Sequence, residues 1–469
     1  MRTLGASEGE GEARSCKGMP LVETLDGSVD PVVAALTKAA RRSMDLCHEK
    51  SIARNEAPVD LLVQTIDLLL DHSDLGAARA RGASRTGQVL LAGFDECGPT
   101  TRLDEALRTA GLAPVHWRRF ASSGHDTCAS PWPAAPSGGA AEESYVACIV
   151  RWSWYAAGDA ASMLVHACAS VTCAGTPLWL CGNDAEGVEA AGALLEEAYG
   201  EASRLVSEDG CALYGSCRGS AGATAASSAR GSLEGWVTHS SLLLPQLGWL
   251  SLGAAHGGAA HGGASGKKRK READSAAEAM ELPWCTYPGL FAGGGLDVMT
   301  MALLQTLPKP PAGARVLDAC CGSGAIAAAL RHAPGGGALR VHMLDADAVA
   351  MHAAKLNVPG AARHWHGAVW PQTSRAFSAG KPMRYHWIVS NPPVHRGQPD
   401  DFRVVAELIR GSRKRLKRYG VLWLVAQEHV PMGRLLALHG RFASVEASSV
   451  PPDGRFVVWR ASGRRERKA

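Results

Sequence analysis

The most restrictive feature of this sequence is a turn of small residues between an apolar strand and a helix. Arg315–Gly324 reads RVLDACCGSG, which predicts a strand that ends at Asp318 and a turn that contains Gly322 and Gly324. A helix is expected to follow over residues 325–332. Glycine adopts positive φ and lets the backbone approach a ligand, while a helix N-terminus supplies N–H donors. The pattern predicts an α/β fold that binds a nucleotide-like ligand at the end of this strand.

A second acid follows the next predicted strand, residues 341–345, which ends at Asp345. Its carboxylate is placed to accept hydrogen bonds from the two ribose hydroxyls of a nucleoside. The dinucleotide fingerprint is incomplete, because the helix-packing glycine is absent and Asp318 precedes the turn. Two carboxylates suit S-adenosylmethionine, which carries a sulfonium and an ammonium and no phosphate, better than NAD. The predicted cofactor-binding residues are Asp318, Cys320, Gly322, Gly324, Asp345 and Asn391.

The strongest chemical signal is an apolar strand, Tyr385–Ser390, that runs directly into Asn391-Pro392-Pro393. Each proline lacks an N–H and restricts the residue before it, so the loop is stiff. A planar amine on a base is a poor nucleophile, and two fixed acceptors can hold its N–H groups while its lone pair faces an electrophilic methyl group. The side-chain oxygen of Asn391 and the carbonyl of Pro392 are the expected acceptors, and no strong general base is required. The predicted catalytic residues are Asn391, Pro392, Pro393 and His395, the last of which either contacts substrate or caps the loop.

Several segments together resemble the class I methyltransferases that make N2-methylguanosine in the ribosomal RNA of the bacterial small subunit. The matching segments are Tyr287–Phe291, Gly295–Val298, Asp318–Gly324, Ser390–Gly397, Leu408–Gly411 and Gly454–Arg460. Weaker similarity to the family's N-terminal domain covers Gln88–Gly93, Thr176–Glu201 and Gly210–Tyr214. The resemblance implies transfer of a methyl group from S-adenosylmethionine to guanine N2 in ribosomal RNA. Methylation of adenine N6 or of a protein glutamine stays open, as does an RNA-binding pseudoenzyme or ribosome-assembly factor.

The same resemblance implies two tandem Rossmann-like methyltransferase domains, of which the N-terminal one is degenerate and the C-terminal one is a seven-stranded class I fold. Two residues depart from the family's pattern. Cys320 stands at the first glycine of the turn, and Val394 stands where an aromatic side chain would stack on a flipped base. Val394 is nevertheless placed on the substrate side of the site. At the start of the N-terminal domain, bulky and charged residues over 92–97 replace the glycines that a cofactor turn needs.

Positive charge is concentrated, although the net charge of the whole chain is only +4. Three basic clusters stand out: Lys267–Arg271, Arg410–Arg418 and Arg464–Lys468. A helix expected over 406–419 would carry one cationic face, which predicts contact with RNA phosphates. The predicted substrate-binding residues are Val394, Arg410, Arg413, Lys414 and Lys417.

The remaining composition bounds the class of protein. No apolar run approaches the roughly 20 residues that span a bilayer, so no membrane contact is expected. The thirteen cysteines are odd in number and lie mostly in apolar stretches, which favours buried thiols over disulfides, and no metal site is predicted. The expected location is cytoplasmic, with nuclear import possible through Lys267–Arg271. RNA, most readily ribosomal RNA, is the expected partner, and a monomer is favoured.

Helices are expected over 32–54 and 59–70, before the first strand. The predicted organisation of the chain has five parts. The parts are a disordered lead-in over 1–30, a helical segment with a degenerate α/β domain over 31–240, a disordered basic insertion over 253–281, a catalytic domain over 282–462 and a basic tail over 463–469.

Overall fold

The computed structural model describes most of the chain between residues 57 and 463. The described ranges are 57–65, 87–94, 100–121, 129–134, 145–152, 158–172, 176–199, 202–208, 210–217, 229–245, 280–371, 383–394, 402–450 and 454–463. Several predictions fall outside these ranges: the lead-in, the helix over 32–54, most of the insertion, His395 and the basic tail. A helix is predicted over 59–70; residues 57–65 are helical, and residues 66–70 lie outside the described ranges.

The N-terminal α/β unit contains a six-stranded mixed sheet. Its strand order is β2-β1-β3-β4-β6-β5, with β1 to β4 parallel and β6 antiparallel to both of its neighbours. Its elements are β1 (Gly87–Ala92), α3 (Thr100–Thr109), β2 (Leu112–Trp117), β3 (Ala147–Arg151), α4 (Asp159–Ser170), β4 (Pro177–Asn183), η2 (Asp184–Glu186), η3 (Val188–Ala190), α5 (Ala191–Tyr199), β5 (Ser203–Glu208) and β6 (Cys211–Cys217). The chain over 184–199 thus forms two short 3₁₀ turns followed by α5.

Packed side-chain and backbone atoms fill the space after β1, which a cofactor-binding turn would leave open. Phe94 is 1% exposed and belongs to the core. A Cβ atom at Gly93 would lie 2.5 Å from the carbonyl oxygen of Arg151, so no side chain fits there. Arg151 is itself buried and pairs with Glu186 at 2.8 Å. These contacts agree with the prediction that this unit is degenerate.

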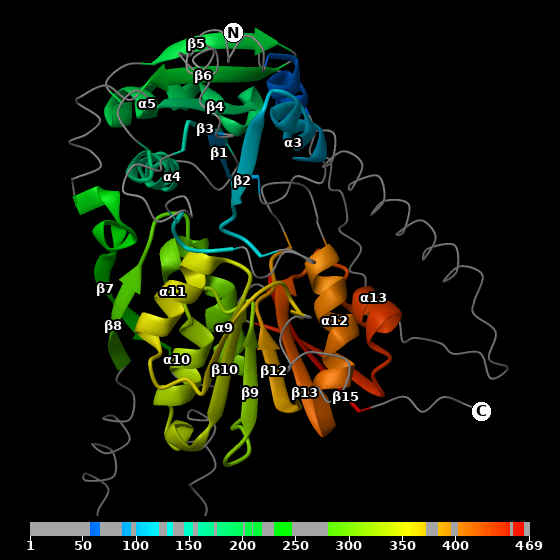
Figure 1. The fold of residues 1–469 in the computed structure, drawn as a ribbon. Helices are drawn as coiled ribbons and strands as arrows, with labels where there is room; N and C mark the ends of the chain where they lie inside the picture. Colours follow the sequence, from blue (N-terminus) through cyan, green and yellow to red (C-terminus); the bar gives the residue numbers. More distant parts are fainter. Residues whose placement is uncertain are drawn as a thin grey trace, which may run out of the picture. The chain divides into compact units, whose positions relative to one another are not determined.

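The C-terminal α/β unit contains a seven-stranded sheet of order β11-β10-β9-β12-β13-β15-β14. The first five strands are parallel, and β15 is antiparallel to β13 and β14. Its elements are α9 (Val298–Thr306), β9 (Arg315–Ala319), α10 (Ala325–His332), η7 (Gly336–Ala338), β10 (Arg340–Asp345), α11 (Ala348–Asn357), β11 (Arg363–His366), β12 (Tyr385–Ser390), α12 (Arg403–Arg415), β13 (Leu416–Gln427), α13 (Met432–Leu435), η8 (Leu436–Gly440), β14 (Ser444–Ser449) and β15 (Phe456–Ser462). Figure 1 shows β10, β9, β12 and β13 side by side, in agreement with this order. The fold class predicted from the sequence is confirmed.

A two-stranded antiparallel ribbon precedes the seven-stranded sheet. It pairs β7 (Thr238–Leu244) with β8 (Met280–Thr286), and η4 (Ala229–Gly231), η5 (Leu233–Trp236) and η6 (Phe291–Gly294) lie before and after it in the chain. The strand β8 begins at Met280, close to residue 282, where the catalytic domain was predicted to begin. The ribbon contributes Leu242, Leu244 and Trp284 to the core beneath the sheet.

One helix boundary was predicted wrongly, and it affects the expected cationic face. The helix α12 spans Arg403–Arg415 rather than 406–419, and Lys417 lies on β13. Leu416 pairs in register with Tyr385 of β12, so sheet pairing takes the chain out of the helix. Arg415, which belongs to the basic cluster Arg410–Arg418, is buried at 6% exposure, and its guanidinium lies over the ring of Trp370.

A buried ion pair joins the segment after β2 to the loop after β10. Arg119 donates two hydrogen bonds of 2.8 Å to the carboxylate of Asp347, and the backbone N–H of Ala121 donates to the carbonyl of Ala346. Arg119 also donates to the carbonyl of Gly289 at 3.1 Å. The loop that follows Asp345 is thus fixed by residues from the N-terminal unit.

Candidate active site

The three predicted site strands end at one edge of the C-terminal sheet. Because β9, β10 and β12 are parallel neighbours, Asp318, Asp345 and Asn391 lie at their carboxyl ends, which we call the carboxyl edge. The hydroxyl of Ser390 donates to the carbonyl of Ala319 at 2.6 Å and ties the end of β12 to the start of the glycine turn. Ligands of open α/β sheets bind at such an edge, so the predicted site has the expected location.

The turn after β9 takes the left-handed conformation at three positions. Gly322 has φ 54°, Gly324 has φ 96° and Cys320 has φ 55°. Glycine adopts this conformation freely, whereas a side chain makes it strained by about 1–3 kcal/mol. A Cβ atom at Gly324 would also lie 3.0 Å from Val358. The conformation is one that favours glycine, and it locates strain in this chain at Cys320.

Asp345 closes the turn from the neighbouring strand. One carboxylate oxygen accepts from the backbone N–H of Gly322 at 2.7 Å, and the other accepts from the N–H of Asp347 at 2.8 Å. Burial, followed by the nearby charge of Asp347, raises the pKa of Asp345 to about 6, although backbone hydrogen bonds act in the opposite direction. Each oxygen retains a lone pair for a further donor such as a ribose hydroxyl.

Asp318 is fully buried behind the turn. One of its oxygens accepts from the backbone N–H of Ala327 in α10 at 3.0 Å, and Oδ1 has no hydrogen-bond partner among the described residues. Burial raises the pKa of this carboxyl well above its ordinary value, and the charge of Asp345 adds to the effect. A buried carboxylate oxygen without a donor is costly, which agrees with the raised pKa of this carboxyl.

Asn391 is the best-defined side chain of the site. Its Nδ2 donates to both carboxylate oxygens of Asp297 at 3.2 Å and to the hydroxyl of Thr300 at 3.0 Å. Asp297 accepts from the backbone N–H groups of Thr300 and Met299, so it also caps α9. An ionised carboxylate only accepts hydrogen bonds, and the amide must therefore turn its NH₂ group toward Asp297. The side-chain oxygen of Asn391 is left facing the other way.

The loop before α9 contacts the glycine turn as well. The hydroxyl of Ser323 and the indole of Trp284 both donate to the carbonyl of Gly294 at 2.7 Å. Ala292, Gly293 and Gly294 have positive φ, which is strained at the alanine. Phe291 beside them is 68% exposed, and Val298 at the start of α9 is 59% exposed. An apolar surface therefore borders the hydrogen-bonded pair of Asp297 and Asn391.

Sequence reasoning missed Asp297 and Thr300 as site residues. The sequence does carry a signal for a helix cap, since an Asp stands before the apolar helix over 298–306. The contact with Asn391, however, joins residues 94 and 91 positions apart. A capping pattern alone contains no information about such a partner.

Several predicted site residues are not gathered around Asn391. Val394 is 4% exposed, so it lies in the core and lacks the surface that contact with a base requires. Lys417 follows the first residue of β13, and that residue pairs with Tyr385 at the start of β12. Asn391 lies six positions after Tyr385 along the extended chain of β12, which places the two about 20 Å apart. Arg410 and Lys414 are exposed and Arg413 is partly exposed on α12, whereas His395 lies outside the described residues.

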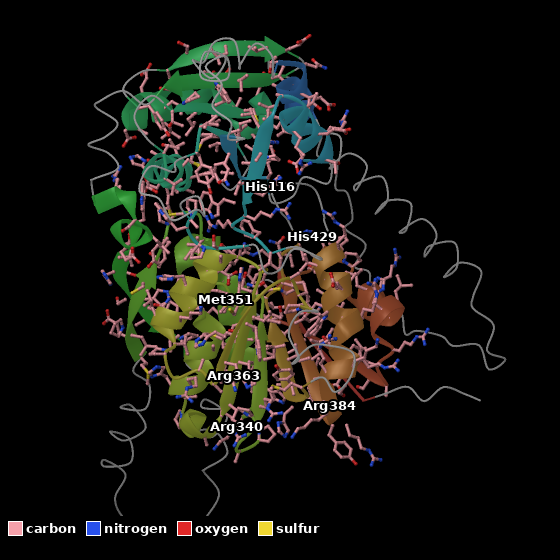
Figure 2. All side chains as sticks on the ribbon, in the orientation of Figure 1. His116, Arg340, Met351, Arg363, Arg384 and His429 are labelled. Atoms are coloured by element: carbon pink, nitrogen blue, oxygen red, sulfur yellow. The ribbon has the colours of Figure 1, made fainter. Side chains whose placement is uncertain are left out.

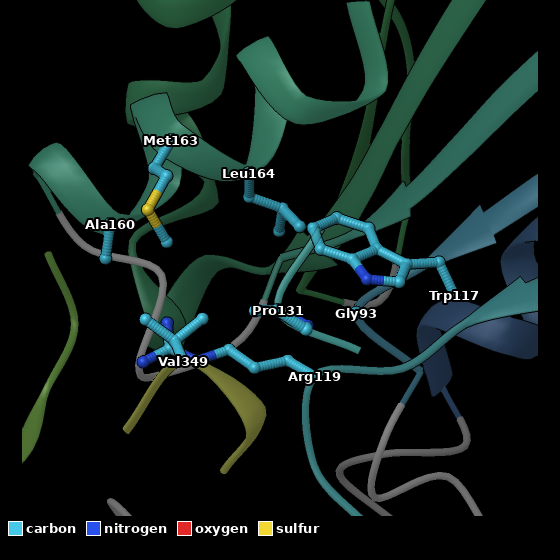
Figure 3. A pocket seen from close by; sticks show the side chains of 8 residues that line it. All are labelled: Gly93, Trp117, Arg119, Pro131, Ala160, Met163, Leu164 and Val349. Carbon is cyan, nitrogen blue, oxygen red and sulfur yellow. The ribbon is translucent and has the colours of Figure 1, made fainter. Parts of the chain in front are cut away.

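The cavity in Figure 3 is separate from the glycine turn. Trp117, Met163 and Val349 are among the residues that line it. Its volume of about 10 Å³ holds no more than a single water molecule.

Among the described residues, no helix is long and apolar enough to cross a membrane.

Comparisons with known proteins assign the C-terminal unit. The family model for the methyltransferase small domain matches residues 281–460. Ribosomal RNA small subunit methyltransferase C from Salmonella typhimurium is 36% identical over 184 residues, which are 39% of this chain and 50% of the relative; the protein of that name from Salmonella enteritidis gives the same values. The chain thus spans about half the length of the curated relatives it matches.

A solved structure resembles a larger part of the chain. The T. thermophilus 16S rRNA N2 G1207 methyltransferase, in complex with AdoMet and guanosine, has a TM-score of 0.57 and 17% identity and covers 82% of this chain and 90% of its own. At this identity the likeness shows the fold alone, and it extends over both α/β units. Residues 281–460 of the chain therefore match the methyltransferase small domain in sequence, and the likeness in fold covers a larger part of the chain.

Proposed function

We propose that this chain is an S-adenosylmethionine-dependent methyltransferase that modifies the exocyclic N2 amine of guanine in small-subunit ribosomal RNA. The observation that carries the proposal is the orientation of Asn391. Its NH₂ group is held by Asp297 and Thr300, and its oxygen remains to accept from an amine at the carboxyl edge. The names of the curated relatives and of the solved structure support the same substrate.

The residues at the carboxyl edge fit the proposed cofactor. Asp318 lies at the end of β9, directly before the turn, and the positive φ values at Cys320, Gly322 and Gly324 would let the backbone approach a ligand. Asp345 would hold the ribose hydroxyls through the remaining lone pairs of its carboxylate. When bound, S-adenosylmethionine supplies an electrophilic methyl group on a sulfonium.

The chain's own residues then act on the amine. The side-chain oxygen of Asn391 and the carbonyl of Pro392 accept its two N–H groups, which fixes the nitrogen and directs its lone pair. As nitrogen gains positive charge, both acceptors stabilise that charge. The proton lost at the end needs no strong base, because the alkylated nitrogen is acidic until it loses the proton. The two prolines keep the acceptors from reorganising during the reaction.

The proposal is tested by mass spectrometry of nucleosides from small-subunit ribosomal RNA incubated with the protein and S-adenosylmethionine. N2-methylguanosine is expected with the wild type and is expected to be lost with Asn391→Ala. Parallel incubations with DNA and with protein separate methylation of adenine N6 or of glutamine. Calorimetry with the cofactor separates an RNA-binding pseudoenzyme, because such a protein would show no heat of cofactor binding.

A further inference from the structure

A cation stands at or next to the first residue of every parallel strand of the C-terminal sheet, at the end opposite Asn391. We call this the amino edge and define it by Arg315, Arg340, Arg363, Arg384, Lys417, Arg418 and Tyr419. Arg315 pairs in register with Arg340, so the first residues of β9 and β10 are aligned, whereas Arg363 pairs with His342 and lies level with the third residue of β10. Figure 2 shows Arg340, Arg363 and Arg384 at one end of the sheet and His429 at the other.

Carboxylates are absent from the segments that form this edge. Residues 307–315, 331–340, 358–363, 383–386 and 413–420 contain eleven Lys or Arg and no Asp or Glu. Arg340, Arg363, Arg384, Lys417 and Arg418 are exposed. The adjoining antiparallel strands β14 and β15 contain one acid, Glu446, and it is paired with Arg460 at 2.7 Å. An ordinary solvated surface mixes both signs of charge, which this edge does not.

The histidines nearest the edge respond to its field. The pKa of His342 is lowered to about 4, first by burial and then by the charges of Arg315, Arg363 and Arg340. The pKa of His386 is lowered by burial and then by Lys417 and Arg315. Both imidazoles therefore lie in a positive potential created by the cations of several strands.

An exposed aromatic ring lies within this cationic edge. Tyr419 is 84% exposed, and the guanidinium of Arg418 lies 5.3 Å from the centre of its ring. A tyrosine this exposed buries almost none of its apolar area in the fold. Exposed aromatic rings among cations are typical of surfaces that stack the bases of single-stranded nucleic acid while the cations contact phosphates.

We propose that the amino edge is a second RNA-binding surface, separate from the carboxyl edge where the base would be modified. Five strands at a spacing of about 4.8 Å make an edge of roughly 20 Å, along which the cations face the phosphates of one RNA strand. The edge lies about 20 Å from Asn391 along β12. It therefore binds a part of a large RNA that is remote from the target base, and a short substrate engages the carboxyl edge alone.

The test compares the full-length wild type with a triple variant, Arg340→Gln, Arg363→Gln and Arg384→Gln, in fluorescence anisotropy with a labelled single-stranded RNA. Loss of three phosphate contacts is expected to reduce the slope of log affinity against log salt by about two. With a small-subunit rRNA transcript as substrate, the KM for RNA is expected to rise about tenfold at unchanged kcat, whereas methylation of a short guanine-containing oligonucleotide should be unaffected. Tyr419→Ala is expected to weaken single-stranded RNA binding about tenfold.

Two matched variants serve as controls. The triple Arg→Lys change at the same positions keeps the charge and should bind like the wild type. The triple change of Arg102, Arg108 and Arg204 to Gln removes equal charge from exposed positions of the N-terminal unit. An unchanged salt slope in the Arg340, Arg363 and Arg384 triple, or an equal fall in the control triple, would overturn the proposal. If no RNA is methylated at all, the proposed activity fails while the anisotropy still tests this surface.

Discussion

Asp297→Asn is the most informative change at the candidate site, because it alters hydrogen-bond polarity without altering size. In the variant, the side-chain oxygen of residue 297 is still required by the backbone N–H of Thr300, which Asp297 now accepts at 2.9 Å. The new NH₂ group must therefore face Nδ2 of Asn391, and two donors would oppose each other. Rotation of the Asn391 amide by half a turn relieves the conflict, because its oxygen can then accept from residue 297 and from the hydroxyl of Thr300.

The rotation leaves the fold intact and removes the acceptor from the substrate. Asn caps a helix as well as Asp does, so the free energy of unfolding should change by about 1 kcal/mol or less. Loss of one fixed polar group from a transition state costs about 100-fold to 1,000-fold in rate, or about 2.7–4 kcal/mol. We therefore expect kcat to fall by about this factor, with the melting temperature and the affinity for S-adenosylmethionine nearly unchanged.

The assay is transfer of a labelled methyl group to a small-subunit rRNA transcript, with kcat and KM measured separately. Thr300→Val is the matched control, because it removes one acceptor of Asn391 and leaves both contacts with Asp297 in place. Its kcat should stay within about tenfold of the wild type. Wild-type kcat in Asp297→Asn, or an equally large loss in Thr300→Val, would refute the proposed orientation of Asn391.

Three further predictions concern the glycine turn, the carboxylate of Asp345 and the core beside the site. Cys320→Gly relieves the strain of φ 55° and should raise the free energy of unfolding, measured by denaturant titration, by about 0.5–1 kcal/mol; a loss of stability would contradict the strain. Because the pKa of Asp345 is raised to about 6 and the ionised form accepts the ribose hydroxyls, cofactor affinity in calorimetry should fall as pH drops below 6, and Asp345→Asn should remove this dependence. The same raised pKa makes this group's contribution to the free energy of unfolding fall as pH rises from about 4 to 6. Val394→Tyr should not restore base stacking but should overpack the core and lower stability by about 1–3 kcal/mol, so an increase in kcat at unchanged stability would show that the residue faces substrate.

Local patterns were sufficient for the elements that carry the candidate site. The helix over 325–332 begins and ends as predicted, because Gly324 starts it and the chain turns at Ala333. The strand before Asn391 was also predicted correctly, since an apolar run that meets two prolines has few other conformations. Because β9, β10 and β12 are parallel, their carboxyl ends meet at one edge, which brings Asp318, Asp345 and Asn391 together.

What the sequence did not predict depends on contacts between distant residues. The predicted end of α12 was wrong because no glycine or proline stands between Gly411 and Gly420 to mark it, whereas the pairing of Leu416 with Tyr385 ends the helix at Arg415. The burial of Val394 and the contact of Asp297 with Asn391 are likewise tertiary. The cationic amino edge is assembled from several strand starts, which are single basic residues in the sequence and become a surface only through strand register.

The most direct test of the central claim is single-turnover methyl transfer to small-subunit ribosomal RNA by the wild type and by Asn391→Ala, with the product nucleoside identified by mass spectrometry. The wild type should form N2-methylguanosine, while Asn391→Ala should bind S-adenosylmethionine and form none. N2-methylguanosine at equal rates with both proteins, or none with either, would contradict the role proposed for Asn391.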